Sequence, residues 1–380
     1  MKSIPKLEHE GLAGGRQNEA GIWDWVVGGV QHNSGMFSLT IGVPCWKVLV
    51  AWQHYNYLEA NVAEGRRILR MNLDETSLCL FQGGGRGNVF ISKAERRRVA
   101  QGVSHSRKRT FLTHVGIICD SPTVQPLLPQ VIIGSERTFS DALLVALLEV
   151  CAPNVFLERG RTAWINARVM QTIMRRLAAA LAPFRREFQP ILLLDAHKCH
   201  VCARVLAAAR DAGIWIVVVP ARLTWLLQPL DTHAFALFKR CLRKAYVAER
   251  IRSRNGEVDL PTFLRCVQTA LREVLQGRQW ADAFASNGFG ASQASVSERV
   301  RSELQLQTIV PAPSARPSVE QLHRVFPQGL RIPAAIWPRF PVPALRLGPR
   351  LRRLAPIRLP EQDPIAHATR SGAVYRMDVD

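Results

Sequence analysis

The chain has 380 residues and a strong excess of basic side chains, with 50 lysines and arginines against 30 acidic residues and a formal net charge of +20. This length provides core for one large domain or two smaller ones. The charge predicts attraction to polyanions, DNA or RNA first, unless it reflects only a generic basic surface or a basic tail. The sequence argues against a membrane span, because no apolar run is long enough. The eight cysteines are scattered and have no secretory context, which predicts reduced thiols.

The first part of the chain is expected to be rich in β-structure. Residues 1–60 are expected to form an N-terminal extension of unclear structure, partly buried against the following domain through its tryptophans Trp23, Trp25, Trp46 and Trp52. Between residues 66 and 133 the pattern predicts strands near 68–74, 77–82, 111–118 and 130–134. The glycine run at 83–87 predicts a turn between them.

The second part of the chain alternates between helices and strands. Apolar periodicity predicts helices near 141–151 and 164–181, a buried strand at 191–195, a helix near 199–211, a strand at 214–219 and a helix from about 231 to 250. Residues 305–380 are rich in proline and arginine. Because prolines remove backbone donors and break helices, this basic tail is expected to be disordered or extended.

Acidic residues stand at the edges of the most apolar segments. Asp195 ends the run Ile191–Leu194, and Asp231 ends Leu226-Leu-Gln-Pro-Leu. A carboxylate in such a place is costly unless it is paired, hydrogen-bonded or bound to a metal, and the carboxyl ends of strands are where open α/β sheets bind ligands. Asp74, with Glu75 as its substitute, supplies a third acid. Together the three indicate a site for divalent metal.

The three motifs and their order resemble a known family. The chain reads Asn72-Leu-Asp74-Glu75-Thr76, then Leu192-Leu-Leu-Asp195-Ala-His-Lys-Cys-His200, then Pro220-Ala-Arg-Leu-Thr-Trp-Leu-Leu-Gln-Pro-Leu-Asp231. These segments resemble N-x-D-E-T, L-L-L-D-G-H-x-x-H and P-x-H-x-T-H-x-L-Q-P-L-D of the DDE superfamily endonucleases, transposase-derived proteins, in the pogo, jerky and centromere-protein-B-like branch. The resemblance covers residues 61–290.

The resemblance implies an α/β fold, an RNase H-like mixed sheet flanked by helices. It implies that Asp74 lies on the first strand, that Asp195 ends the fourth, and that Asp231 opens the helix after the fifth. It further implies cleavage, and joining, of DNA phosphodiesters with two Mg²⁺ or Mn²⁺ ions. In this scheme Asp74 bridges both ions, while Asp195 and Asp231 each complete the coordination of one.

Each acid also has a simpler interpretation. Asp231 is well placed to cap the helix that follows it. Asp74 and Glu75 could be ordinary charges at the edge of a strand, and Asp195 could be a strand-end carboxylate that bonds backbone amides. The segment His197–Cys202 invites a zinc interpretation, which is weak because a structural zinc site needs four ligands and no second Cys/His pair is evident.

Two basic clusters are candidates for phosphate contacts, with solvated surface charge as the alternative. They are Arg107, Lys108 and Arg109 in a predicted hairpin, and Lys239, Arg240, Arg243 and Lys244 on the helix after Asp231. DNA is therefore the expected partner and the nucleus the expected location. A homodimer is compatible with the resemblance, as is a separate DNA-recognition module, because residues 1–60 do not resemble helix-turn-helix modules.

The chain departs from the family pattern at three positions. Ala196 replaces the glycine after the second acid, and Arg222 and Trp225 replace the two histidines before Gln-Pro-Leu-Asp. Two hypotheses follow. The chain is a metal-dependent DNA-cleaving and joining enzyme, as the intact acid trio suggests, or it is a domesticated or decayed DNA-binding protein without turnover, as the substitutions suggest.

Overall fold

The computed structural model describes residues 12–17, 23–27, 30–32, 45–80, 111–148, 151–253, 257–290, 296–305, 314–327 and 329–340. Two sheets are present within these ranges. Strands β1 (Leu12–Gln17), β2 (Trp23–Val27) and β3 (Val30–His32) form a small antiparallel sheet. The remaining strands form a six-stranded sheet in the order β7-β6-β5-β4-β8-β9.

The six-stranded sheet is mixed, with β4 (Arg67–Cys79) at its centre. On one side, β5 (Phe111–Cys119) and then β6 (Gln130–Ser135) follow antiparallel, and β7 (Val155–Gly160) is parallel to β6. On the other side, β8 (Phe188–Asp195) and β9 (Trp215–Val219) run parallel to β4. Three antiparallel strands followed by parallel additions confirm the RNase H-like mixed sheet expected from the sequence.

The predicted strands need two corrections. The stretch expected to form strands 68–74 and 77–82 is the single strand β4, since β5 pairs with it continuously from Met71 to Cys79 and the acidic pair does not interrupt the ladder. Strand β7 was missed, because its mixed sequence Val-Phe-Leu-Glu-Arg-Gly shows no alternation and it is only partly buried. With β7 included, Asp195 ends the fifth strand of this sheet rather than the fourth.

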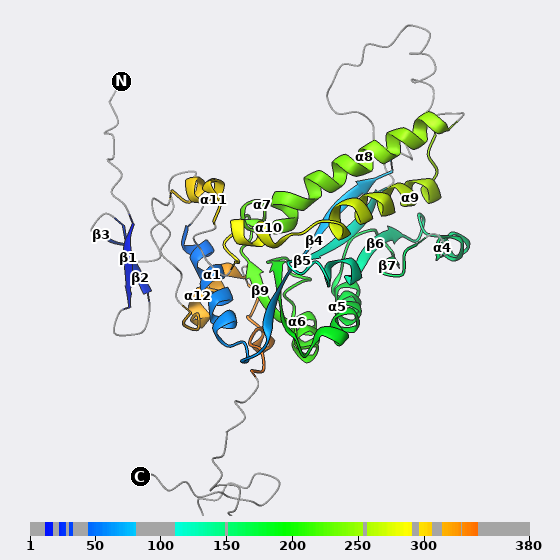
Figure 1. Cartoon of the computed structure of the whole chain (residues 1–380). Coiled ribbons are helices and arrows are strands. Elements are labelled where there is room, and N and C mark those ends of the chain that lie inside the picture. Colours follow the sequence, from blue (N-terminus) through cyan, green and yellow to red (C-terminus); the bar gives the residue numbers. More distant parts are fainter. Residues whose placement is uncertain are drawn as a thin grey trace, which may run out of the picture. The chain divides into compact units, whose positions relative to one another are not determined.

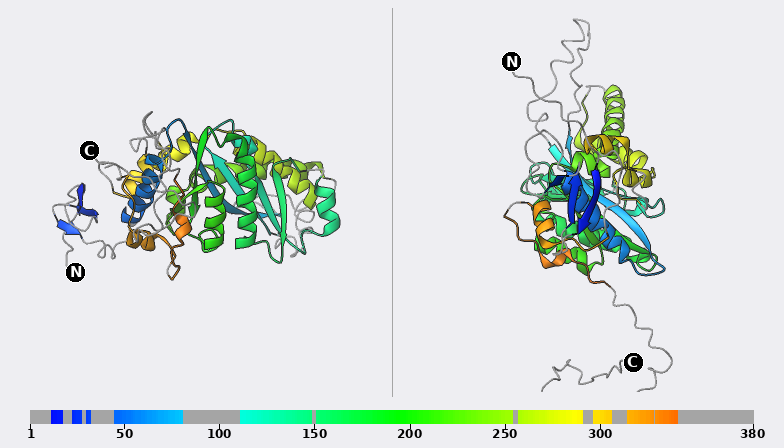
Figure 2. Two further views of the ribbon diagram at one scale, coloured as in Figure 1. Left: turned by 90° about the horizontal axis from the view of Figure 1, so that it is seen from below. Right: turned by 90° about the vertical axis from the view of Figure 1, so that its left-hand side faces the viewer.

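Helices cover both faces of the sheet (Figures 1 and 2). Helices α5 (Ala167–Leu181) and α6 (Ala203–Asp211) pack on one face, in a core with β4 residues Leu69, Met71 and Leu73. Helix α5 begins at 167 rather than 164 because the Asn166 side chain caps it. Helices α8 (Phe235–Arg252) and α9 (Leu260–Ala270) lie over the other face. The short elements are η1 (Gln125–Leu127), α4 (Asp141–Leu148), η2 (Ala182–Phe184), α7 (Thr224–Leu227), η3 (Leu230–Ala234), η4 (Leu271–Gln276) and η6 (Ala334–Ile336).

Helix α1 (Cys45–Ala60) belongs to this fold, although it lies within the expected N-terminal extension. Trp52 is fully buried and its indole N–H donates to the carbonyl of Asn287, which follows helix α10 (Ala281–Ser286), at 3.1 Å. Arg70 of β4 donates to the Tyr55 hydroxyl at 2.6 Å and to the Asp120 carboxylate at 2.8 Å. The bond between Arg70 and Tyr55 attaches α1 to the central strand, and the Trp52 bond attaches it to the segment around Asn287.

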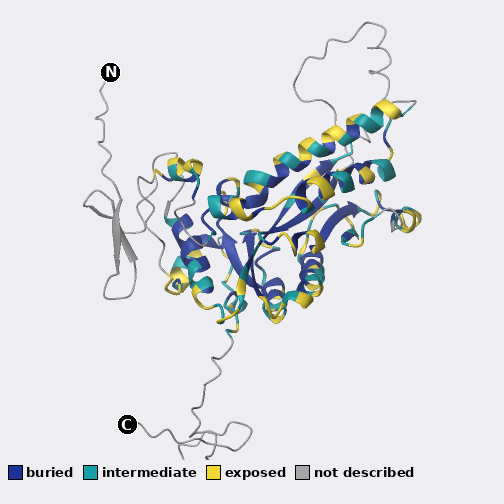
Figure 3. Ribbon diagram, in the orientation of Figure 1, coloured by how far each residue is buried: buried dark blue, intermediate teal, exposed yellow. Residues whose placement is uncertain are grey.

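The segment after residue 305 differs in part from the expected disordered tail. Helix α12 (Val319–Val325) buries Leu322 and Val325 in the core that contains the sheet and α5. A capping box between Ser318 and Gln321 begins this helix, and the prolines flank it rather than interrupt it. Residues 341–380 of the tail lie outside the described residues. Figure 3 shows the sheet as the most buried layer.

The other C-terminal helices are α10 (Ala281–Ser286) and α11 (Glu298–Glu303). Among the described residues, no helix is both long and apolar enough to cross a bilayer.

Gly288 offers a test of how α1 is held. Its φ is +84°, and a β-carbon added there would lie 2.4 Å from the Trp52 ring, whereas Gly213 has φ +71° and open space around it. We expect Gly213→Ala to lower the free energy of unfolding by about 1–2 kcal/mol through backbone strain alone. Gly288→Ala should lower the free energy of unfolding by about 1–3 kcal/mol more than Gly213→Ala, because the added methyl group overpacks the site. Denaturant unfolding of both variants measures the difference, and equal losses would contradict the tight Trp52 contact.

Candidate metal and nucleic-acid site

Asp74 lies on the sheet face that η3 and α8 cover. It pairs across the ladder with Gly116, and a β-carbon on Gly116 would meet Phe235 at 3.1 Å and Leu230 at 3.5 Å. Glycine at this position therefore lets the helical layer approach the sheet beside the acid. Asp74 is only 8% exposed.

Strand register brings Asp195 to the level of Asp74. In the parallel pair β4–β8, Asn72 lies opposite Leu193, and each acid follows two residues later on its own strand. Because side chains two residues apart share a face and neighbouring strands lie about 4.8 Å apart, both carboxylates face the same side at adjacent strand positions. Asp195 itself is the last residue of β8.

Asn72 holds the third acidic segment against the sheet. Its side-chain amide N–H group donates to the Gln228 side-chain oxygen at 2.7 Å and to the Leu193 carbonyl at 3.1 Å. Its side-chain oxygen accepts from the backbone N–H of Leu230 at 2.9 Å. Since Asn72 is fully buried, these bonds fix the backbone that immediately precedes Asp231 to a strand position two residues from Asp74.

Burial and the neighbouring acids shift the pKa of Asp74. Burial, together with the negative charges of Asp231, Glu75 and Asp195, raises the pKa of Asp74 to about 9, against the opposing hydrogen bond from the Glu75 backbone N–H. A carboxyl group shifted in this way carries an electrostatic cost that an added cation would remove. Asp231 is exposed, in the first turn of η3.

His200 joins two of the acids. Its Nδ1 bonds Asp195 Oδ1 and its Nε2 bonds Glu75 Oε1 at 2.7 Å. Burial lowers the pKa of His200, but its bonds to Asp195, Cys199 and Glu75 raise it well above its usual value. Burial likewise raises the pKa of Asp195, but the bond from His200 brings it below its usual value. These bonds favour the protonated form of His200, which lies between two carboxylates.

Sequence reasoning assigned no role to Asn72 or Gln228 and considered His200 only in the weak zinc interpretation. The motif spacing H-x-x-H and the polar Asn72 within an apolar strand were the available signals. What they lacked was the long-range pairing that brings β4, β8 and the Gln-Pro-Leu-Asp segment together. Glu75, considered as a substitute for Asp74, instead contacts His200.

The structure contradicts the simpler interpretation of Asp231 and supports that of Asp195 in part. Neither η3 nor α8 has a side-chain cap, so Asp231 does not cap the helix that follows. Asp195 does accept a backbone bond, from His197 N at 3.1 Å, but on the same Oδ1 that contacts His200. Among the described contacts, Oδ2 of Asp195 has no partner.

The basic residues of α8 that the sequence singled out are all exposed. They are Lys239, Arg240, Arg243 and Lys244, and none makes an ion pair within the described part of the chain. They lie on the helix that continues directly from η3, the element that carries Asp231. The other predicted cluster, Arg107, Lys108 and Arg109, lies outside the described residues.

Two of the three departures from the family pattern, Arg222 and Trp225, contact each other. Arg222 has φ +67°, and its carbonyl accepts the Trp225 indole N–H at 2.9 Å. Arg299 donates to the Trp225 carbonyl at 2.8 Å. Ala196 is 5% exposed and packs in the core. The described contacts therefore show Arg222 and Trp225 closing a local turn, and none of these contacts involves Asp74.

Asn72→Ala tests how the acidic segment is held. The buried partners left without a bond cost about 1–3 kcal/mol each, so we expect a loss of about 3 kcal/mol or more in the free energy of unfolding. Asn154→Ala is the matched control, because Asn154 also makes two side-chain bonds, to the Pro126 and Leu128 carbonyls, but is only half-buried. We expect Asn154→Ala to lower the free energy of unfolding by about 1 kcal/mol. Similar losses for the two variants in denaturant unfolding would contradict the role of Asn72.

Comparison with known proteins finds a family match over part of the chain. Residues 128–283, which include Asp195 and Asp231, match the model of the family described as DDE superfamily endonuclease. No curated protein sequence matches the chain. Similar solved structures are a Mos1 transposase paired-end complex with left transposon end (15% identity, TM-score 0.33, 70% of this chain and 68% of that one) and a Mos1 mariner paired end complex with Mn (14%, 0.33, 69% and 68%). The matched segment and the ordered motifs thus make residues 128–283 similar to the DDE superfamily endonucleases.

Proposed function

We propose that this chain cleaves and joins DNA phosphodiesters with divalent cations held by Asp74, Asp195 and Asp231. The observation that carries the proposal is geometric: the β4–β8 register sets Asp74 and Asp195 side by side, and the bonds of Asn72 hold the segment before Asp231 beside them. The raised pKa of Asp74 supports it. Carboxylate oxygens are the ligands that Mg²⁺ and Mn²⁺ prefer, so the donor set of this site fits the cations that the family match implies.

All three acids would share in holding the cations. Asp74, the most buried of the three, would do so together with Asp195 and Asp231. Because Oδ1 of Asp195 already accepts from His197 N and His200, its Oδ2 is the oxygen available to a cation. When bound, the two ions would activate a water or a 3′-hydroxyl and stabilise the leaving oxygen.

The chain's own residues orient the site. Asn72 fixes the backbone before Asp231, and His200 holds Asp195 and Glu75 in place through its two nitrogens. The cationic side chains of α8 would bind phosphates on either side of the scissile bond, which gives salt-dependent binding that is largely independent of sequence.

The proposal includes a nuclear location, because the substrate is DNA. Recognition of specific ends would then come from a homodimer or from a separate DNA-recognition module. The second candidate function is DNA binding without turnover, motivated by Ala196, Arg222 and Trp225. The experiment below distinguishes it from cleavage.

Nicking of supercoiled DNA in Mg²⁺ or Mn²⁺ tests the cleavage proposal. We expect the full chain to nick and EDTA to stop it. Asp195→Asn should reduce the rate at least about 100-fold, because it removes a charge that stabilises the cations by several kcal/mol. Asp211→Asn, an exposed acid at the end of α6, is the control and should nick normally. DNA binding by the unmodified chain without metal-dependent nicking would favour the second candidate.

The salt dependence of DNA binding tests the α8 surface. Replacing Lys239, Arg240, Arg243 and Lys244 with alanine should weaken binding and reduce the slope of log K against log salt by up to about 3–4, or roughly 0.9 for each phosphate that is no longer neutralised. The control replaces four exposed arginines of α5 and the turn after it, Arg168, Arg175, Arg185 and Arg186. Equal changes in both variants would show a generic charge effect and remove α8 from the proposed interface.

A further inference from the structure

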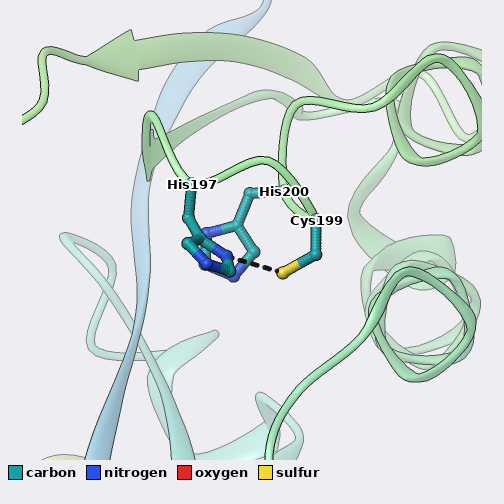
Figure 4. Close-up of side chains that lie close together, drawn as sticks. All are labelled: His197, Cys199 and His200. Atoms are coloured by element: carbon teal, nitrogen blue, oxygen red, sulfur yellow. Dashed lines mark hydrogen bonds between the residues drawn. The ribbon is translucent and has the colours of Figure 1, made fainter. Parts of the chain in front are cut away.

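The loop after β8 gathers a second set of metal-binding side chains, different in kind from the carboxylates. Ligand atoms of His197, Cys199 and His200 all lie within 4.8 Å of one another (Figure 4). The sequence showed only closely spaced histidines and cysteines without a second pair. The fold makes a compact group from residues that follow one another within a single turn.

Backbone bonds produce this convergence. The N–H groups of His200 and Val201 both donate to the His197 carbonyl, at 2.9 and 3.2 Å, so the chain folds back over one turn. The turn brings His197 Nδ1 to 2.9 Å from Cys199 Sγ and the two imidazole rings to a centroid separation of 5.4 Å. The local backbone therefore orders the three ligands.

The burial of the three residues is graded. His197 is exposed, Cys199 is half-buried and His200 is buried. A cation can therefore reach the group from solvent on the His197 side and be held against the protein on the His200 side. Structural metal sites closed to solvent lack such an open side.

We propose that His197, Cys199 and His200 form a binding site for a borderline-soft divalent cation of the Zn²⁺ class. One thiolate and two imidazoles suit Zn²⁺, whereas Mg²⁺ and Ca²⁺ prefer oxygen ligands. The site is thus chemically distinct from the carboxylates that the cleavage proposal uses, although it adjoins Asp195. Cys202 is not a member, since its thiol is directed at the Cys199 carbonyl oxygen, 3.6 Å away.

The carboxylates beside His200 complete the site. Metal-bound histidine usually donates its other ring N–H to a carboxylate, and both His200 nitrogens already have carboxylate partners, Asp195 and Glu75. A cation that takes one nitrogen replaces the proton on it and leaves the other nitrogen bonded to its carboxylate. Where that nitrogen is Nε2, the displaced carboxylate is Glu75, which the cleavage proposal does not use and which can supply a fourth, oxygen ligand.

Cobalt spectroscopy of the purified full chain tests this site without DNA or activity. Co²⁺ reports tetrahedral geometry through its visible bands and a thiolate ligand through a near-ultraviolet charge-transfer band. We expect one equivalent of Co²⁺ to produce both, and Zn²⁺ to displace it. Cys199→Ser should abolish the charge-transfer band and weaken Zn²⁺ binding at least about tenfold, the least that loss of even an outer-shell partner costs.

Cys202→Ser is the matched control, a nearby cysteine of similar burial that should keep the band. His197→Gln, at an exposed position, should also weaken binding and serves if Cys199→Ser does not fold, as judged by circular dichroism. No thiolate band in the unmodified chain, a band that persists in Cys199→Ser, or equal loss in Cys202→Ser would each overturn this ligand set. Because the readout needs no cleavage, failure of this site and failure of the proposed nuclease are separate results.

Discussion

The buried hydrogen bonds of Asn72 are the constraint on which the site depends. One side chain joins the central strand to the Leu193 carbonyl of β8, to the Gln228 side chain and to the Leu230 backbone. Asp231 lies beyond the end of any strand, so sheet pairing alone does not position it. Asn72 supplies this connection with both its donor and its acceptor. A hydrophobic residue of similar size would leave the β-sheet intact and the third acid unplaced.

A second network supports the same segment from its outer side. The Thr232 hydroxyl donates to the Gln228 carbonyl at 2.9 Å and accepts from the Asn287 side chain at 2.9 Å. The Asn287 carbonyl in turn accepts from the indole of Trp52 on α1. Helix α1 and the region after α10 are far apart in sequence, and together they support the turn that carries Asp231. Acidic side chains that lie close together reduce the stability of the fold. This framework offsets that loss, as expected for a site that binds cations.

The sequence predicted those features that have local causes. Buried apolar runs identified β8 and β9, and acids at the edges of apolar segments identified Asp195 and Asp231, because burial and charge cost are visible residue by residue. The continuity of β4, the existence of β7, the burial of Leu322 and the bridge from His200 to Glu75 were not predictable in this way. Each depends on a partner far along the chain, and no local pattern encodes that partner.

Calorimetric measurement of Mn²⁺ binding tests the central claim most directly. Because the pKa of Asp74 is raised to about 9 by burial and neighbouring acids, the group holds a proton at pH 7 and must release it when a cation binds. Titrations at pH 7 in two buffers of different ionisation enthalpy count the released protons. The account predicts a proton release that disappears, together with most of the affinity, in Asp74→Asn. Binding with the same affinity and proton count in that variant would contradict it.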